Sequence, residues 1–181
     1  MKTGAMVKQF IAKDGRQIVL RTPKWEDLDD LNEVINSLVE EGSDITRDKK
    51  VTREEEAAWL GRVLADLEND KTFYLVAEVE GKVIANSEVS RHSGYSSHVG
   101  MVGIAIRDGY RDVGIGTEMI QTLIAQAEKM GLKMLLLDVF ASNERAVHVY
   151  EKVGFKETGR KPKFFYKNGR YIDDVLMARE T

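Results

Sequence analysis

A glycine-containing segment in the middle of the chain has the residue types needed to hold a phosphate group. It reads Arg111-Asp112-Val113-Gly114-Ile115-Gly116-Thr117 and is followed by apolar residues at helical spacing. Because glycine has no Cβ, the backbone N–H groups around Gly114 and Gly116 can approach an anion closely. A helix that begins here adds the positive end of its dipole, and the Thr117 hydroxyl adds one more donor. These residues predict a pyrophosphate cradle that requires no metal.

Two common phosphate-binding motifs do not describe this segment. A Walker motif requires a Lys-Ser or Lys-Thr pair after its last glycine, and a dinucleotide fingerprint requires G-x-G-x-x-G after the first strand of a βαβ unit. Here the third glycine is missing, and the segment lies in the middle of the chain. Taken alone, the segment is also compatible with an ordinary strand-to-helix turn that uses glycine for its shape.

Two further residues are spaced so that they can act together. Tyr150 follows Asn143 by seven residues, which is about two turns of a helix, so both side chains share one helix face with Val147. A single asparagine at a helix start is usually a cap, and a single buried tyrosine is usually a core residue with a satisfied hydroxyl. The combined spacing favours a shared role for the two residues over these separate ones.

Strands and helices alternate along the chain and must position these residues. Strands are predicted over 17–21, 73–79, 82–89, 99–106 and 133–140, with a final hairpin that turns at Lys167-Asn168-Gly169. Four helices are predicted. The first begins at Thr22-Pro23 and ends at Gly42, and the second begins at the capping box of Thr52 and Glu55. The third ends at Gly131, and the fourth runs from Ser142 to Gly154. The pattern predicts a single domain over residues 1–181. Its class is α/β (α+β), with a mixed central sheet flanked by helices.

The composition excludes several classes of protein. The chain has 181 residues, a formal net charge of −3 and no cysteine. This charge argues against general nucleic-acid binding, and the lack of cysteine excludes disulfides, thiolate nucleophiles and cysteine-ligated zinc. No histidine and carboxylate spacing indicates a metal site. No apolar run reaches the length of a membrane span, and Met1–Met6 contain no signal core, so we expect a cytoplasmic protein without a membrane partner.

The sequence resembles the GNAT superfamily of acetyl-CoA-dependent N-acetyltransferases. Arg111, Gly114 and Gly116 match the R/Q-x-x-G-x-G/A signature of that family. The stretch from Leu137 through Asn143 and Tyr150 to Gly154-Phe155 looks like the strand, helix and G-F turn that follow it. The resemblance covers about residues 16–179 and is nearest to the branch that acetylates polyamines and the N-termini of ribosomal proteins.

The resemblance implies acetyl-CoA as co-substrate and assigns roles to its binding residues. The pyrophosphate would lie on the amides of the loop from Arg111 to Thr117. The pantetheine arm would pair with the backbone of Ile104, Ala105 and Ile106. Asn143 would hydrogen-bond the cofactor, and Tyr150 would lie near its sulfur.

Attack of an amine on a thioester requires that the amine lose a proton and that the departing thiolate gain one. The Tyr150 hydroxyl is the expected proton donor, and a backbone N–H near Ile104 is expected to hold the developing oxyanion. Glu88 is the first choice for the base, because its strand adjoins the cofactor strand. Asp138 is the second choice. For both carboxylates, ordinary solvent-facing alternation in a strand remains the alternative.

The acceptor is expected to be a primary amine of a small molecule. The motivation is an acidic cluster of Glu40, Glu41 and Asp44 at the end of the first helix, which could attract a cation. A solvated loop would show the same residues. Two alternatives stay open: acetylation of a protein N-terminus, and binding of acetyl-CoA without turnover. A homodimer is compatible with the resemblance.

Overall fold

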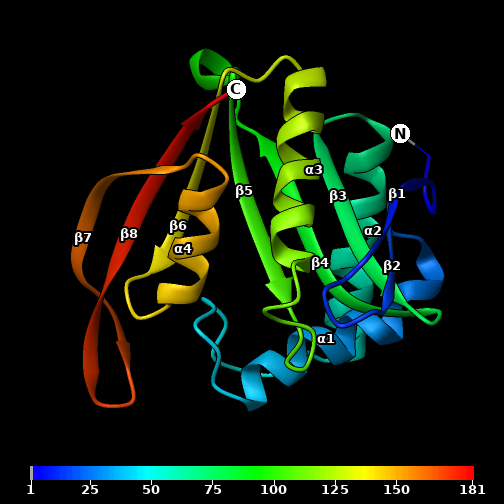
Figure 1. Ribbon diagram of the computed structural model, residues 1–181, viewed down its shortest axis with the longest axis horizontal. Coiled ribbons are helices and arrows are strands. Elements are labelled where there is room, and N and C mark those ends of the chain that lie inside the picture. Colours follow the sequence, from blue (N-terminus) through cyan, green and yellow to red (C-terminus); the bar gives the residue numbers. More distant parts are fainter. Residues whose placement is uncertain (1) are drawn as a thin grey trace.

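The computed structural model describes residues 2–181, and within them eight strands form one sheet (Figure 1). The strand order is β1-β2-β3-β4-β5-β6-β8-β7, and every neighbouring pair is antiparallel except β5 and β6. The strands are β1 Met6–Ile11, β2 Gln17–Arg21, β3 Thr72–Val79, β4 Lys82–Arg91, β5 Val99–Ile106, β6 Met134–Phe140, β7 Lys156–Lys167 and β8 Arg170–Glu180. The predicted mixed sheet is confirmed.

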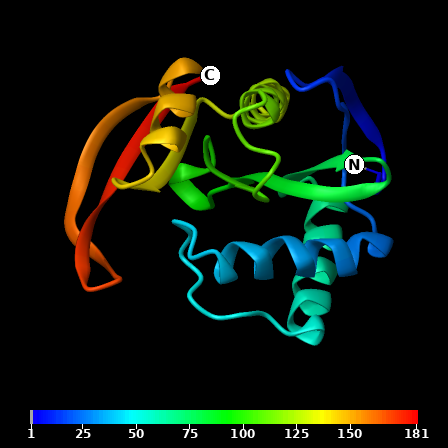
Figure 2. The same ribbon diagram turned by 60° about the horizontal axis from the view of Figure 1, so that its bottom comes forward.

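Helices cover both faces of the sheet. The helices are α1 Leu28–Glu40, α2 Arg53–Glu68, α3 Ile115–Lys129 and α4 Glu144–Lys152, with short 3-10 turns at Trp25–Asp27 and Gly94–Ser96. Figure 2 shows α3 and α4 on one face and α1 and α2 on the other. The main apolar core lies on the α3 face, and a smaller one around Leu31, Leu60 and Val76 lies on the α1/α2 face. No helix in residues 2–181 is long and apolar enough to cross a membrane.

The parallel pair β5 and β6 separates after a short paired stretch, and this separation makes room for a site. The two strands are paired only between Val99–Met101 and Met134–Leu136. Beyond these residues β5 keeps its other neighbour, because Gly103 and Ile104 still pair with β4. The carboxyl ends of β5 and β6 therefore diverge, as Figure 1 shows. The loop after β5 and the start of α4 lie at this divergence.

The structure corrects three details of the sequence interpretation. Strand β1 was not predicted, because it is a largely exposed edge strand without alternating burial. Thr22 does not cap a helix: its hydroxyl accepts from the Ala5 amide and donates to the Lys2 carbonyl, and α1 begins only at Leu28. Ser142 is not the cap of α4 either. Asn143 fills that role, because its side-chain oxygen accepts from the Ala146 amide.

Other local signals are confirmed. Thr52 and Glu55 form the predicted capping box at the start of α2. The hairpin between β7 and β8 turns at Asn168 and Gly169, which both have positive φ, as a type I′ turn requires. Gly131 and Gly154 also have positive φ and follow α3 and α4, where a left-handed residue ends a helix.

Candidate functional site

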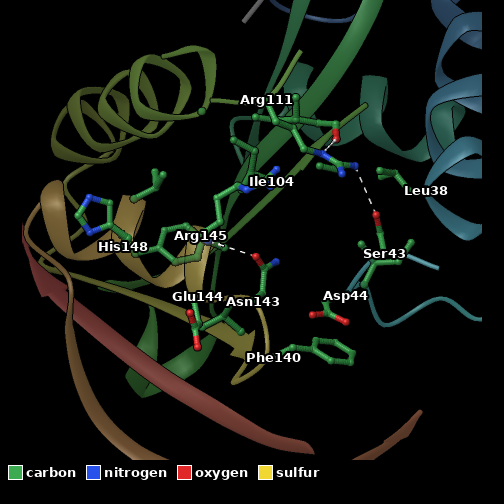
Figure 3. A pocket seen from close by; sticks show the side chains of 18 of the residues that line it. Leu38, Ser43, Asp44, Ile104, Arg111, Phe140, Asn143, Glu144, Arg145 and His148 are labelled. Atoms are coloured by element: carbon green, nitrogen blue, oxygen red, sulfur yellow. Dashed lines mark hydrogen bonds between the residues drawn. The ribbon is translucent and has the colours of Figure 1, made fainter. Parts of the chain in front are cut away.

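A cavity of about 1030 Å³ opens where β5 and β6 diverge. Its lining comes from the end of β5, the loop after it, the start of α3, the end of β6, α4, and the loop that follows α1. Figure 3 shows side chains from these separate elements turned toward one space, with Arg111 and Ser43 on one side and Asn143 and Phe140 on the other. Nearly all of the binding residues predicted from the sequence line this cavity: Ile104, Ala105, Ile106, Arg111, Asp112, Gly114, Gly116, Thr117, Asn143 and Tyr150.

The start of α3 has the properties of an anion cradle. Gly114 is the N-cap residue with φ of 95°, and Asp112 has φ of 64°, so two residues before the helix have a left-handed backbone conformation. The first intrahelical bond is donated by Glu118 to the Gly114 carbonyl. The preceding amides, at Ile115, Gly116 and Thr117, have no acceptor among residues 2–181. Free amides at a helix N-terminus fit the pyrophosphate of acetyl-CoA.

The two glycines of this loop are required for different reasons. Gly114 adopts a backbone conformation that L residues rarely take. Gly116 has an ordinary helical φ, but a Cβ placed there would lie 3.2 Å from Ile106 Cδ1. Gly116 therefore lets the helix start lie close to the end of β5. Val113 and Ile115, also predicted as binding residues, do not line the cavity, and Ile115 is buried in the core.

Arg111 fixes the position of the loop. Its Nε donates to the Ile106 carbonyl at 2.8 Å, and its guanidinium forms an ion pair with Glu41. Ser43 Oγ lies 3.4 Å from the same guanidinium, as drawn in Figure 3. These contacts connect the end of β5 with the loop after α1. The guanidinium is thus committed to protein partners on two sides of the cavity.

Tyr150 lines the cavity, and its hydroxyl is not used by the surrounding residues. The residue is 7% exposed, packs edge-on against Phe155, and its hydroxyl has no hydrogen-bond partner within residues 2–181. Burial raises the pKa of Tyr150 to about 12, because the phenolate would be poorly solvated. The hydroxyl is therefore protonated at neutral pH. A protonated and unpartnered donor is the state required of a general acid.

Glu88 does not line the cavity, although it is close to it. It pairs with Gly103 of β5 on one side and with Tyr74 of β3 on the other. Burial raises the pKa of Glu88, and the nearby Tyr74 hydroxyl lowers it by a smaller amount. Glu88 therefore holds a proton more readily than an exposed glutamate. Its expected role as base needs a water molecule or a movement of the side chain.

Asp138 lines the cavity, and it belongs to a group that the sequence reasoning missed. Lys161 of β7 lies 3.3 Å from Asp138 Oδ2 and 2.9 Å from Asp174 Oδ2 of β8. Asp174 is 1% exposed and also lines the cavity. In the sequence, Asp174 follows Asp173 in an ordinary final strand, and no neighbouring residue indicates that Asp174 is buried at a cavity.

The acidic residues at the end of α1 and in the loop after it are not a free cluster. Glu40 pairs with Lys50, Glu41 pairs with Arg111, and Asp44 pairs with Lys167. Glu41 and Asp44 do line the cavity, whereas Glu40 does not. Their charges are neutralised by these partners, so the expected attraction of a cation by this loop loses its basis.

Comparison with known proteins identifies the family. Residues 20–176 match the model of the acetyltransferase (GNAT) domain. The chain belongs to the GNAT acetyltransferase family. This membership confirms the resemblance, the fold and the enzyme class expected from the sequence, with acetyl-CoA as co-substrate.

Individual GNAT proteins are similar to this one at moderate identity. The L-amino acid N-acetyltransferase AaaT of Escherichia coli is 29% identical over 58% of this chain and 66% of its own length. An N-alpha-acetyltransferase of Sulfurisphaera tokodaii is 33% identical over 58% of this chain and 67% of its own length. The crystal structure of a GNAT acetyltransferase from Streptococcus pneumoniae superimposes with a TM-score of 0.81 at 25% identity, covering 91% of this chain and 99% of that one.

Proposed function

We propose that this GNAT protein transfers the acetyl group of acetyl-CoA directly to the primary amine of a small molecule. The observation that carries the proposal is Tyr150, which lines the cavity where β5 and β6 diverge and has a protonated hydroxyl without a partner among residues 2–181. A protein that only sensed acetyl-CoA would have no need of a proton donor at this place.

The cavity has separate places for the two ends of acetyl-CoA. The free amides at the start of α3 suit the pyrophosphate. From Ile104 to Ile106, β5 pairs with β4 on one side and has lost β6 on the other, so this edge can accept an extended arm. Bound in this way, acetyl-CoA supplies an activated thioester. We expect Asn143, at the start of α4, to fix the arm between the two strands.

The residues around the reacting atoms have distinct tasks. The amine nitrogen forms a bond to the acetyl carbon, and the bond from that carbon to sulfur breaks. A backbone N–H near Ile104 holds the charge that develops on the carbonyl oxygen. Tyr150 donates its proton to the departing sulfur and recovers a proton from solvent. Glu88 through water, or Asp138 directly, takes up the proton of the amine.

The test is incubation with acetyl-CoA and a panel of acceptors, following free CoA and identifying the acetylated product by mass. The panel contains small amines, free amino acids and short peptides with free N-termini. We expect CoA release that depends on a small amine and is slower in Tyr150→Phe. Acetyl-CoA binding without product on any acceptor would refute catalysis. Peptides preferred by more than about tenfold in kcat/KM would show that the acceptor is a protein N-terminus.

A further inference from the structure

The carboxylate of Asp174 is buried beside the cavity with one oxygen unused. Asp174 is 1% exposed; its Oδ2 accepts from Lys161 at 2.9 Å, but its Oδ1 has no hydrogen-bond partner among the described residues. A buried charged oxygen without a donor is unfavourable, and native proteins keep few of them. Since Asp174 lines the cavity, the missing donor can come from a molecule bound there.

Strand register places Asp174 on the face of the sheet that carries α1 and α2. Asp174 lies opposite Phe140 of β6 and opposite Lys161 of β7, so these three side chains share a face. Val139 and Val175 also lie opposite each other and belong to the core on the α3 face. The pyrophosphate cradle is at the start of α3. The Asp174 carboxylate thus borders the part of the cavity that remains for the acceptor.

Register also separates Asp174 from the reacting centre. If the offset of the β5 and β6 pairing continued, Ile104 would lie level with Val139, next to Phe140. Asp174 is one strand further away, which adds about 5 Å because neighbouring strands are 4.7–4.9 Å apart. A group held by Asp174 is therefore not the nitrogen that attacks the thioester at the divergence. It is a second group of the same acceptor molecule.

The charges around Asp174 select a cation. Asp138 and Asp174 share the single ammonium of Lys161, which leaves one negative charge. The next ion pair, Asp44 with Lys167, is neutral. Phe140 and Phe165 stack with ring centroids 3.6 Å apart and supply an apolar wall. An anionic end with an apolar wall suits an alkyl chain that ends in an ammonium group and repels a carboxylate.

A bulge in β7 holds this arrangement in place. Between Lys161 and Phe165 the pairing with β8 shifts, and Lys163 has φ of 55°. The Lys163 amide donates to Asp173 Oδ1 on the other face of β8. The bulge lets Lys161 face Asp174 while Phe165 stacks on Phe140. Bulges of this kind re-aim side chains next to functional sites.

We propose that Asp174 binds a second ammonium group of the acceptor, so that the preferred substrate is a small primary amine with a cationic far end. This inference rests on the proposed function and names its substrate class. It also predicts poor use of amines whose far end is a carboxylate, including free amino acids.

Three probes of equal length test the proposal by calorimetry on the CoA-loaded protein: 1,6-diaminohexane, hexylamine and 6-aminohexanoate. We expect the diamine to bind at least tenfold tighter than hexylamine, and 6-aminohexanoate to bind most weakly. Asp174→Asn keeps the shape of the side chain and should reduce diamine binding to the level of hexylamine. The matched control is Asp173→Asn, one residue away on the opposite face. Its Oδ1 can still accept from the Lys163 amide, so the bulge is kept and all three probes should bind as they do to the wild type.

A second variant with the opposite expectation guards against a failure of Asp174→Asn to fold. Lys161→Gln removes the competing ammonium from a side chain that is 41% exposed, so it should tighten diamine binding. Equal affinity for the diamine and hexylamine in the wild type, or diamine binding unchanged in both variants, would overturn the proposal. If the diamine binds through Asp174 but is never acetylated, the subsite stands and the proposed function fails. If amines are acetylated but Asp174→Asn and Lys161→Gln change nothing, only the subsite fails.

Discussion

Replacing Tyr150 by phenylalanine should separate catalysis from folding and binding. Tyr150 is 7% exposed, and its hydroxyl has no hydrogen-bond partner among residues 2–181. Removing the hydroxyl therefore leaves no other polar group without a partner. We therefore expect the free energy of unfolding to change by less than about 1 kcal/mol. Affinity for acetyl-CoA should also stay nearly unchanged, because the pyrophosphate cradle is on another element.

The rate of acetyl transfer should fall by about 10- to 1000-fold, the range of lost general acid catalysis. This corresponds to about 1.4 to 4 kcal/mol in the activation barrier. Because burial raises the pKa of Tyr150 to about 12, the acid stays protonated through neutral and mildly alkaline pH. A rise of pH from about 7 to about 9 should therefore not remove the contribution of Tyr150.

The assay is single-turnover release of free CoA thiol, which isolates the chemical step from product release. Tyr171→Phe, on the exposed face of β8, is the control for the loss of a tyrosine hydroxyl elsewhere. An unaltered single-turnover rate in Tyr150→Phe would show that solvent protonates the thiolate. In that case Tyr150 would be a core residue only, and the main support for the proposed function would be lost.

Three other predictions concern the cradle, Glu88 and the buried ion pair near α1. Gly116→Glu, whose Cβ would lie 3.2 Å from Ile106, should weaken acetyl-CoA binding by about 3 kcal/mol, or more than 100-fold, in calorimetry, while Gln121→Glu on the exposed face of α3 should not; wild-type affinity in a folded Gly116→Glu protein would contradict the cradle. Burial raises the pKa of Glu88 in the folded protein. The contribution of Glu88 to the free energy of unfolding is therefore favourable below the ordinary glutamate pKa and is lost as the pH rises through the pKa of the folded state. Glu88→Gln should therefore gain stability relative to wild type in urea unfolding between about pH 4 and about pH 8, and a constant difference would disprove the burial effect. Asp27→Asn should lower the free energy of unfolding by about 3 kcal/mol, because it leaves the buried guanidinium of Arg21 without its 2.7 Å partner; a loss below about 1 kcal/mol would mean that Glu78 alone satisfies Arg21.

Local sequence signals determined much of the fold. Hairpin turns, capping residues and apolar runs depend on neighbours within a few residues, so they can be read without knowledge of the tertiary structure. The strand Val99–Ile106, the capping box of Thr52 and the Asn168-Gly169 turn were predicted correctly for this reason. Most residues predicted to bind acetyl-CoA do line one cavity, and they could be singled out because the glycine loop and the Asn143 to Tyr150 spacing are local patterns.

Local signals failed where a distant segment supplied the partner. Thr22 has the type and position of a helix cap, yet its hydroxyl is used by Lys2 and Ala5 of the N-terminal segment. The acidic residues after α1 look like a cation site in the sequence, but Arg111 and Lys167, far along the chain, neutralise them. No spacing in the sequence shows such pairings, since they exist only after the sheet has formed.

The carboxylates of the proposed acceptor site are brought together by tertiary structure alone. Asp138, Lys161 and Asp174 lie on three different strands, and only the order β6-β8-β7 and the bulge in β7 bring them together. The sequence thus sufficed to predict the anion cradle, because such a cradle needs only the amides of one continuous loop and helix start. The proposed ammonium site depends on side chains that converge from separate strands. The sequence could not predict it, because charge and burial at such a place are set by packing rather than by sequence neighbours.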